Sequence, residues 1–200
     1  MNAIVIGVCL AALAADSNND ASRNDAVSNP LTAPWTGPYR GVPPFDAVKV
    51  ADLKPALEAG MREQLAAVDA IAANREPATF DNTLAAMEAS GRTLDRVSTI
   101  YDVWSSTMST PDFQEVEREM EPKLAAFRDT LVQNDKLFAR IAAVYEGRDT
   151  LCRTPEQKRL AWLYYTNFVR AGAKLDAAGK KRVAEINQRL ASLYTDFAQN

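Results

Sequence analysis

The residue types that carry most enzyme chemistry are sparse in this 200-residue sequence, which contains no histidine. Without imidazole the chain cannot form a Ser-His-Asp or Cys-His nucleophile, and it cannot bind zinc through a histidine ligand. Only two cysteines occur, Cys9 and Cys152. No histidine base is available to activate Cys152, so we interpret it as an unreactive thiol that is exposed or half-buried near a loop.

Carboxylates remain as candidate acids, bases or metal ligands, and a metal site built from carboxylates alone stays formally open. Asp95 and Asp102 could act as an acid–base pair, but nothing in the sequence places them in one pocket. A run of acidic residues could attract a cation, although side chains at alternate positions of a helix point in several directions. A solvated face is therefore the preferred interpretation of Asp112, Glu115, Glu117, Glu119 and Glu121.

Aromatic and basic residues add no specific site. The 23 basic and 26 acidic residues are mixed along the chain, and Lys180-Lys181-Arg182 is too short for a nucleic-acid patch, so we expect no nucleic-acid partner. Five aromatic residues could line a ligand groove, but packing between helices is the preferred interpretation. They are Tyr101, Trp104, Tyr164, Tyr165 and Phe168. We accordingly assign no catalytic, cofactor-binding or metal-binding residue in this chain.

Hydrophobic periodicity predicts an all-α fold, an antiparallel bundle of about six helices. Apolar residues recur at three- and four-residue spacing over most of the chain, and no strand-length run alternates with a period of two. Apolar residues make up 47% of the sequence and charged residues 24%, as in soluble globular domains. The predicted helices cover residues 52–74, 80–108, 110–131, 134–147, 154–172 and 176–200.

Local signals set several helix boundaries. Pro55 fits a first turn, Thr154 begins a capping box, and Asp176 is an N-cap. Gly91 interrupts an apolar stripe, which predicts a close approach between two helices. The last predicted helix has no stop signal before residue 200, and a truncated chain ends in this way more readily than a natural one. Its apolar stripe consists of Val183, Ile186, Leu190, Leu193 and Phe197.

The N-terminal quarter differs from the rest. Residues 1–15 read as a signal peptide with a short apolar core, although no basic residue precedes that core. We therefore expect export to the periplasm, with a cytoplasmic location as the alternative if the leader is not functional. Residues 16–30 are predicted to be a flexible linker, and residues 31–49 an extended Pro-, Gly- and aromatic-rich segment packed on a helical domain of residues 50–200.

Short motifs in a fixed order over about 170 residues resemble the N-terminal region of bacterial peptidyl-dipeptidases. These belong to the thimet-oligopeptidase-like family of zinc metallopeptidases. The motifs are Asn29-Pro30-Leu31, Gly41-Val42-Pro43-Pro44-Phe45-Asp46, the stretch 52–61, Thr79-Phe80-Asp81-Asn82-Thr83, Met87-Glu88-Ala89-Ser90-Gly91, Leu94-Asp95-Arg96-Val97, the stretches 155–160 and 168–173, and the stretch 186–193.

The resemblance implies part of a two-lobed, fully helical ellipsoid with a deep channel. In that family a His-Glu-x-x-His helix and a further glutamate hold one zinc ion, and the whole enzyme releases dipeptides from the C-termini of short peptides. None of those residues is present here, so the chain is expected to be an inactive channel wall whose partner is the missing catalytic lobe. The last two predicted helices should then expose apolar surface. The alternative is a self-sufficient helical module that binds peptides or acts as a scaffold.

Overall fold

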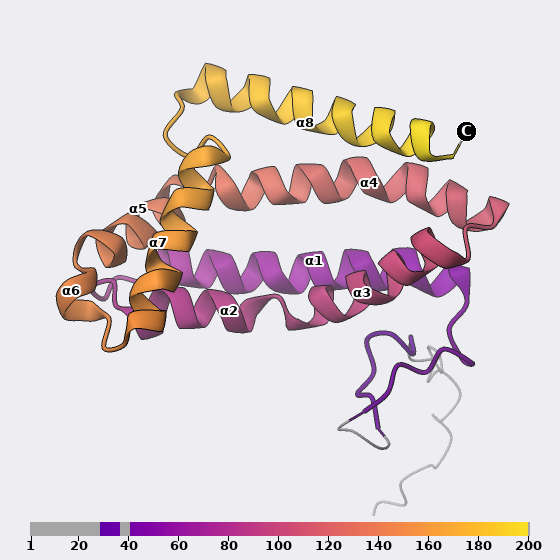
Figure 1. The fold of residues 1–200 in the computed structure, drawn as a ribbon, viewed down its shortest axis with the longest axis horizontal. Coiled ribbons are helices and arrows are strands. Elements are labelled where there is room, and N and C mark those ends of the chain that lie inside the picture. Colours follow the sequence, from indigo (N-terminus) through magenta and orange to yellow (C-terminus); the bar gives the residue numbers. More distant parts are fainter. Residues whose placement is uncertain (1–28, 37–40, 200) are drawn as a thin grey trace, which may run out of the picture.

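The computed structural model describes residues 29–36 and 41–199, and these fold into helices joined by short loops, with no strand among them (Figure 1). The all-α prediction is confirmed. The predicted signal peptide and residues 16–28 of the predicted linker lie outside the described residues. In chain order the elements are α1 (Val50–Ala73), the π-helical segment η2 (Phe80–Ala85), α2 (Ala86–Ser90), α3 (Arg92–Thr107), α4 (Pro111–Val132), α5 (Asp135–Glu146), α6 (Arg148–Leu151), α7 (Pro155–Arg170) and α8 (Ala177–Ala198).

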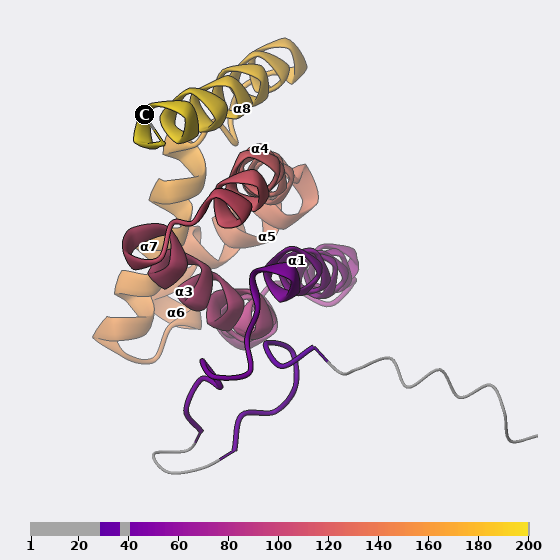
Figure 2. The same cartoon turned by 90° about the vertical axis from the view of Figure 1, so that its right-hand side faces the viewer.

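The long helices are stacked in layers. In both views α1 lies beside the η2–α3 stretch, α4 covers that pair, and α8 lies outermost on α4 (Figures 1 and 2). Helix α7 crosses one end of the stack and packs on α5 and η2. None of the described helices is long and apolar enough to cross a membrane. Because α8 lies outermost, only its face toward α4 is covered within the part of the chain that the structure describes.

Two apolar clusters hold the stack together, and α1 contributes to both. The first lies between α1, α3 and α4 and is centred on fully buried Leu53, Leu57 and Phe113. The second lies between the far end of α1, η2–α2, α5 and α7, and is centred on Leu84, Leu137 and Ile141. Burial of such side chains stabilises the fold by about 1.5–3 kcal/mol each relative to exposure.

The predicted helix 80–108 is divided in the structure. It begins as the π-helical η2 and is interrupted at Gly91, where α2 ends and α3 begins. The close approach between helix backbones occurs at another glycine, Gly60. A Cβ on Gly60 would lie 2.9 Å from the Cα of Leu94, whereas one on Gly91 would meet only the end of the Gln64 side chain, at 2.8 Å. Gly60 is thus the residue that lets α1 and α3 approach at backbone distance.

Most predicted helix ends agree with the structure. Asp176 caps α8 by accepting a hydrogen bond from the Gly179 amide at 2.7 Å, and Thr154 accepts one from Gln157 at 3.3 Å. Gly172 has φ +99° just after α7, where only glycine is unstrained. The prediction that Pro55 lies in a first turn is wrong, because α1 begins at Val50 and Pro55 falls in its second turn.

Residues 29–36 and 41–49 lie against the start of α1 and against α3. The side chain of Asn29 donates a hydrogen bond to the carbonyl of Asp52 at 2.8 Å. Arg96 on α3 donates to the carbonyls of Leu31 and Thr32, both at 3.2 Å, and its guanidinium lies 4.7 Å from the Trp35 ring. Because Leu31 is fully buried, this segment contributes to the first apolar cluster.

Candidate functional surface

Helix α8 exposes the apolar stripe that the sequence places on it. The exposed fractions are 41% for Ile186, 41% for Leu190, 52% for Leu193 and 81% for Phe197, and the neighbouring Tyr194 is 69% exposed. These residues recur at three- and four-residue spacing and form one helix face, which we call the α8 apolar face. Such a face is normally buried, so within the described residues α8 lacks a partner on this side.

Polar contacts hold the opposite face of α8 on α4. Asn187 donates to Oδ1 of Asp129 at 2.7 Å. Near the C-terminal end of α8, Gln199 donates to the carbonyl of Gln114 at 3.1 Å and to Oε2 of Glu117 at 2.7 Å. At the other end Gln133 donates to the carbonyl of Lys180 at 3.1 Å. Hydrogen bonds therefore fix which side of α8 faces α4. Ile186, Leu193 and Phe197 are turned away from α4, while Leu190 and Tyr194 lie at the edge of the α4–α8 contact.

A cavity of about 490 Å³ lies between α4 and α8. Three carboxylates of α4 border it, those of Glu117, Glu121 and Asp129, at intervals of four and eight residues. Glu117 and Asp129 are each only 8% exposed. Glu121 accepts a hydrogen bond from the Tyr101 hydroxyl at 3.0 Å, and burial together with the negative charge of Glu121 raises the pKa of Tyr101. The carboxylates are spread over twelve residues of α4, and the exposed Arg128 also borders the cavity.

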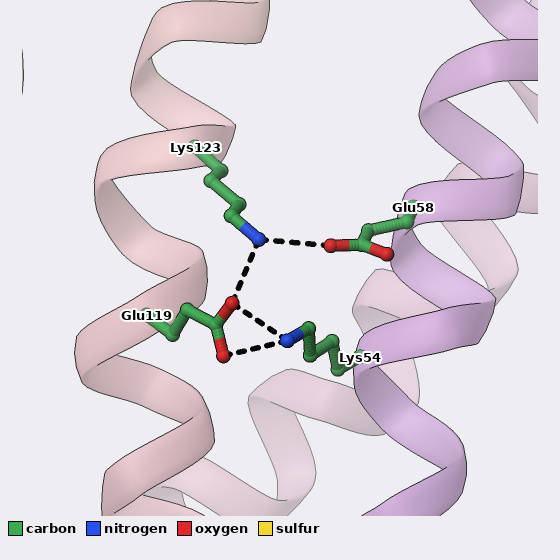
Figure 3. Close-up of polar contacts among 4 residues, drawn as sticks. All are labelled: Lys54, Glu58, Glu119 and Lys123. Carbon is green, nitrogen blue, oxygen red and sulfur yellow. Dashed lines mark hydrogen bonds and ion pairs between the residues drawn. The ribbon is translucent and has the colours of Figure 1, made fainter.

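A second charged group joins α1 to α4 on the surface (Figure 3). Lys123 lies 2.9 Å from Glu58 and 2.8 Å from Glu119, and Lys54 lies 2.6 Å from Glu119. Hydrogen bonds from Lys123 and Lys54 lower the pKa of Glu119 to about 2, and the bond from Lys123 lowers the pKa of Glu58. All four charges are balanced within the group, which indicates a structural link between helices.

The structure separates the acidic residues that the sequence groups together. Glu119 faces α1, Glu121 faces Tyr101, and Glu115 is exposed. The expectation of a solvated face is wrong for Glu117, which is buried because Ser105 and Gln199 both donate to its carboxylate. Sequence reasoning thus missed that Glu117 and Asp129 are buried. Twelve residues place them about 120° apart around an ideal helix, so periodicity gave no signal for either.

The other candidate residues form no site. Asp95 and Asp102 are both exposed, and their separation of seven residues on α3 places them about 10 Å apart along its axis. The aromatic residues divide between the two apolar clusters, Tyr101 with Trp104 in the first and the three others in the second, as expected for core packing. Cys152 is 3% exposed, not on the surface or half-buried, because it packs in the second cluster, and burial raises its pKa.

Within residues 29–36 and 41–199, no three Asp, Glu or Cys side chains are grouped so that they could hold a metal ion. The sequence supplies no histidine in any of its 200 positions. The residues of this chain therefore do not fit a zinc site with imidazole ligands.

Comparison with known proteins gives matches over most of the chain. It is 33% identical over 171 residues to the dipeptidyl carboxypeptidase of Escherichia coli (strain K12) and 32% identical over 172 residues to that of Salmonella typhimurium. Each match covers 86% of this chain and 25% of the relative. The oligopeptidase A of Salmonella typhimurium is 22% identical over 174 residues, which is 87% of this chain and 25% of that protein. No family model matches the sequence.

The chain spans about a quarter of the length of these curated relatives. On these matches, the chain is homologous to the dipeptidyl carboxypeptidase and oligopeptidase A peptidases of the thimet-oligopeptidase family.

Proposed function

We propose that this chain is the channel-wall segment of a zinc peptidyl-dipeptidase that releases dipeptides from the C-termini of short peptides. In this proposal the zinc ligands and the general base belong to a catalytic part outside these 200 residues. The chain itself contributes shape and a docking face. The homology to dipeptidyl carboxypeptidases supports the reaction class. The absence of histidine from the sequence supports the assignment of the zinc ligands to another part of the peptidase.

The observation that carries the proposal is the α8 apolar face. Its residues are 41% to 81% exposed although their periodicity is that of a packed helix. The relatives are about four times as long as the matched segment, so they contain enough further chain to cover this face. We therefore assign the catalytic part of the peptidase as the partner that packs on α8.

A reconstitution experiment tests the proposal. The chain is mixed with Escherichia coli dipeptidyl carboxypeptidase from which the matching quarter has been removed, and dipeptide release from a blocked peptide is measured. We expect release from the mixture and none from either part alone. The double variant Leu193→Asp/Phe197→Asp should reduce release more than about tenfold, since burying each apolar side chain contributes about 1.5–3 kcal/mol.

A matched control separates docking from charge. Gln188→Asp/Ser192→Asp adds the same two charges to exposed polar positions of α8 and should leave release unchanged. Equal release with the two double variants, or release by the chain alone, would contradict the proposal. A stable chain that binds peptides without the catalytic part would favour the self-sufficient module instead.

A further inference from the structure

The exposed side of α8 is not apolar throughout, because Arg189 lies in the middle of it. Arg189 comes three residues after Ile186 and four before Leu193, a spacing that puts all three side chains on one side of the helix. All three are exposed. Asn187, which is bonded to α4, lies about 160° from Arg189 around the helix. Arg189 is therefore turned away from α4 together with the apolar side chains.

The Arg189 guanidinium has no partner in the part of the chain that the structure describes. No hydrogen bond, ion pair or ring contact involves it. Glu185, one turn earlier, pairs instead with Arg182, at 3.3 Å. Asp196, seven residues later, lies about 10 Å further along the helix axis. Arg189 thus carries a charge that the described residues leave unpaired.

Covering the apolar side chains of this face also removes Arg189 from water. A surface that packs on both Ile186 and Leu193 passes over the residue between them, which is Arg189. A guanidinium group stays charged and has five donors and no acceptor, so it is costly to bury without acceptors opposite it. A carboxylate meets this requirement best, since its two oxygens match two parallel N–H donors.

The apolar spacing alone does not fix how a partner is aligned along α8. Ile186 and Leu193 are seven residues apart, and so are Leu190 and Phe197. A partner displaced by seven residues would therefore recover similar apolar contacts, as in a coiled coil whose register only a polar or charged residue specifies. The residue that sets the alignment must break this repeat.

The charged residues of the same side do break it. Seven residues before Arg189 is Arg182, which is already paired with Glu185, and seven residues after it is Asp196, which has the opposite charge. A carboxylate that fits opposite Arg189 would meet a like charge at Asp196 after a shift in one direction. After a shift in the other direction it would meet a cation that is already paired. Both misalignments are disfavoured by charge, which is how paired helices commonly exclude wrong registers.

We infer that the catalytic part presents a carboxylate to Arg189, and that this contact sets the register in which the catalytic part packs on α8. That the covering surface belongs to the catalytic part rests on the proposed function. That this surface is acidic opposite Arg189 rests on the position of the guanidinium and on its lack of a partner. Ile186 and Leu193 contribute apolar area to the contact, and Arg189 contributes specificity.

Binding of Arg189 variants to the catalytic part tests the inference. The full 200-residue chain is titrated by calorimetry into the Escherichia coli dipeptidyl carboxypeptidase that lacks the matching quarter. Arg189→Gln should weaken binding more than about tenfold, since it removes one partner of a covered charge pair. Arg189→Glu should weaken binding further, because it brings two like charges together. Both free variants should keep the helicity and stability of the wild type, because Arg189 is exposed.

Lys181 provides the matched control. It is a second exposed cation of α8 that has no partner among the described residues. It lies about 120° from Leu193 around the helix, and so on a different side from the apolar residues. Lys181→Gln and Lys181→Glu make the same changes of charge as the two Arg189 variants and should leave the affinity unchanged.

The inference is overturned if the wild-type chain does not bind, if Arg189→Gln binds like Lys181→Gln, or if Arg189→Glu binds as well as Arg189→Gln. Binding and dipeptide release that are both insensitive to Arg189 would remove the charge contact and leave the proposed function standing. Binding that depends on Arg189 but yields no dipeptide release would contradict the proposed function and leave the contact intact.

Discussion

At the residue scale, the acidic side chains of α4 do three different things although they are close in the sequence. Glu119 is paired with two lysines on the surface, Glu117 is buried among neutral donors, and Asp129 retains a buried oxygen without a partner. Periodicity alone indicates that these residues point in different directions. It does not reveal that Glu117 and Asp129 are buried, because their burial depends on polar contacts with Gln199 and Asn187 of α8.

The ion-pair group in Figure 3 predicts a pH dependence of stability. The folded pKa of Glu119 is about 2, below the value of about 4.3 in an unfolded chain. The depressed pKa means that the carboxylate stabilises the fold above about pH 4.3, and this contribution is lost as the pH falls toward 2. Urea unfolding between pH 6 and pH 2.5 should show a smaller loss of stability for Glu119→Gln than for the wild type. The same loss in both proteins would contradict the pairing, and Glu115→Gln serves as the unpaired control.

Cys152 is predicted to be unreactive in the folded chain. It is 3% exposed, and burial raises its pKa, so little thiolate forms and reagents have little access. In a Cys9→Ser background, modification by a thiol-specific disulfide reagent at pH 8 should be slow until urea unfolds the protein. Rapid modification of the folded protein, with helicity unchanged, would show that the thiol is accessible.

At the element scale, the sequence predicts the number of major helices and most of their caps, because apolar spacing and capping residues are local. It does not predict the break between α2 and α3 or the polar contacts that hold α8 on α4. Those features depend on contacts between distant residues, such as Gly60 with Leu94 and Asn187 with Asp129. The exposed apolar surface expected on the last two helices is present, most clearly at Leu193 and Phe197.

The contact between α1 and α3 gives a prediction for two glycines. Gly60→Ala would place a methyl group 2.9 Å from the Leu94 Cα, so one helix must shift, at a cost of about 1–3 kcal/mol. Gly91→Ala meets only the flexible end of Gln64 and should cost less. The free energies of unfolding, measured by urea titration of helicity, should rank wild type and Gly91→Ala above Gly60→Ala. A reversed order of the two variants would mean that the helices do not approach at Gly60.

At the scale of the whole molecule, the described residues form a layered bundle with an uncovered outer helix. The two apolar clusters are complete within the inner layers, whereas α8 is attached by polar contacts and turns its apolar face away. This arrangement agrees with homology to peptidases about four times as long as the matched segment. Under the proposed function, α8 is held in place by α4 and its outer face is the surface that receives the partner.

The uncovered face can be measured directly. A dye that fluoresces in apolar environments should bind to the wild-type chain. Leu193→Asp/Phe197→Asp should reduce the fluorescence, because it removes the most exposed aliphatic side chain and the most exposed aromatic side chain of the α8 apolar face. Gln188→Asp/Ser192→Asp should retain the wild-type signal. If the wild-type chain binds no dye, the face is already covered, for example by a second copy, and a sizing column would then show a dimer.

The most direct test of the account is peptide hydrolysis by the purified 200-residue chain in the presence of added zinc. We predict that no dipeptide is released and that no stoichiometric zinc remains after dialysis, because the chain has no histidine with which to hold the metal. Dipeptide release that follows the chain through a sizing column would contradict the account.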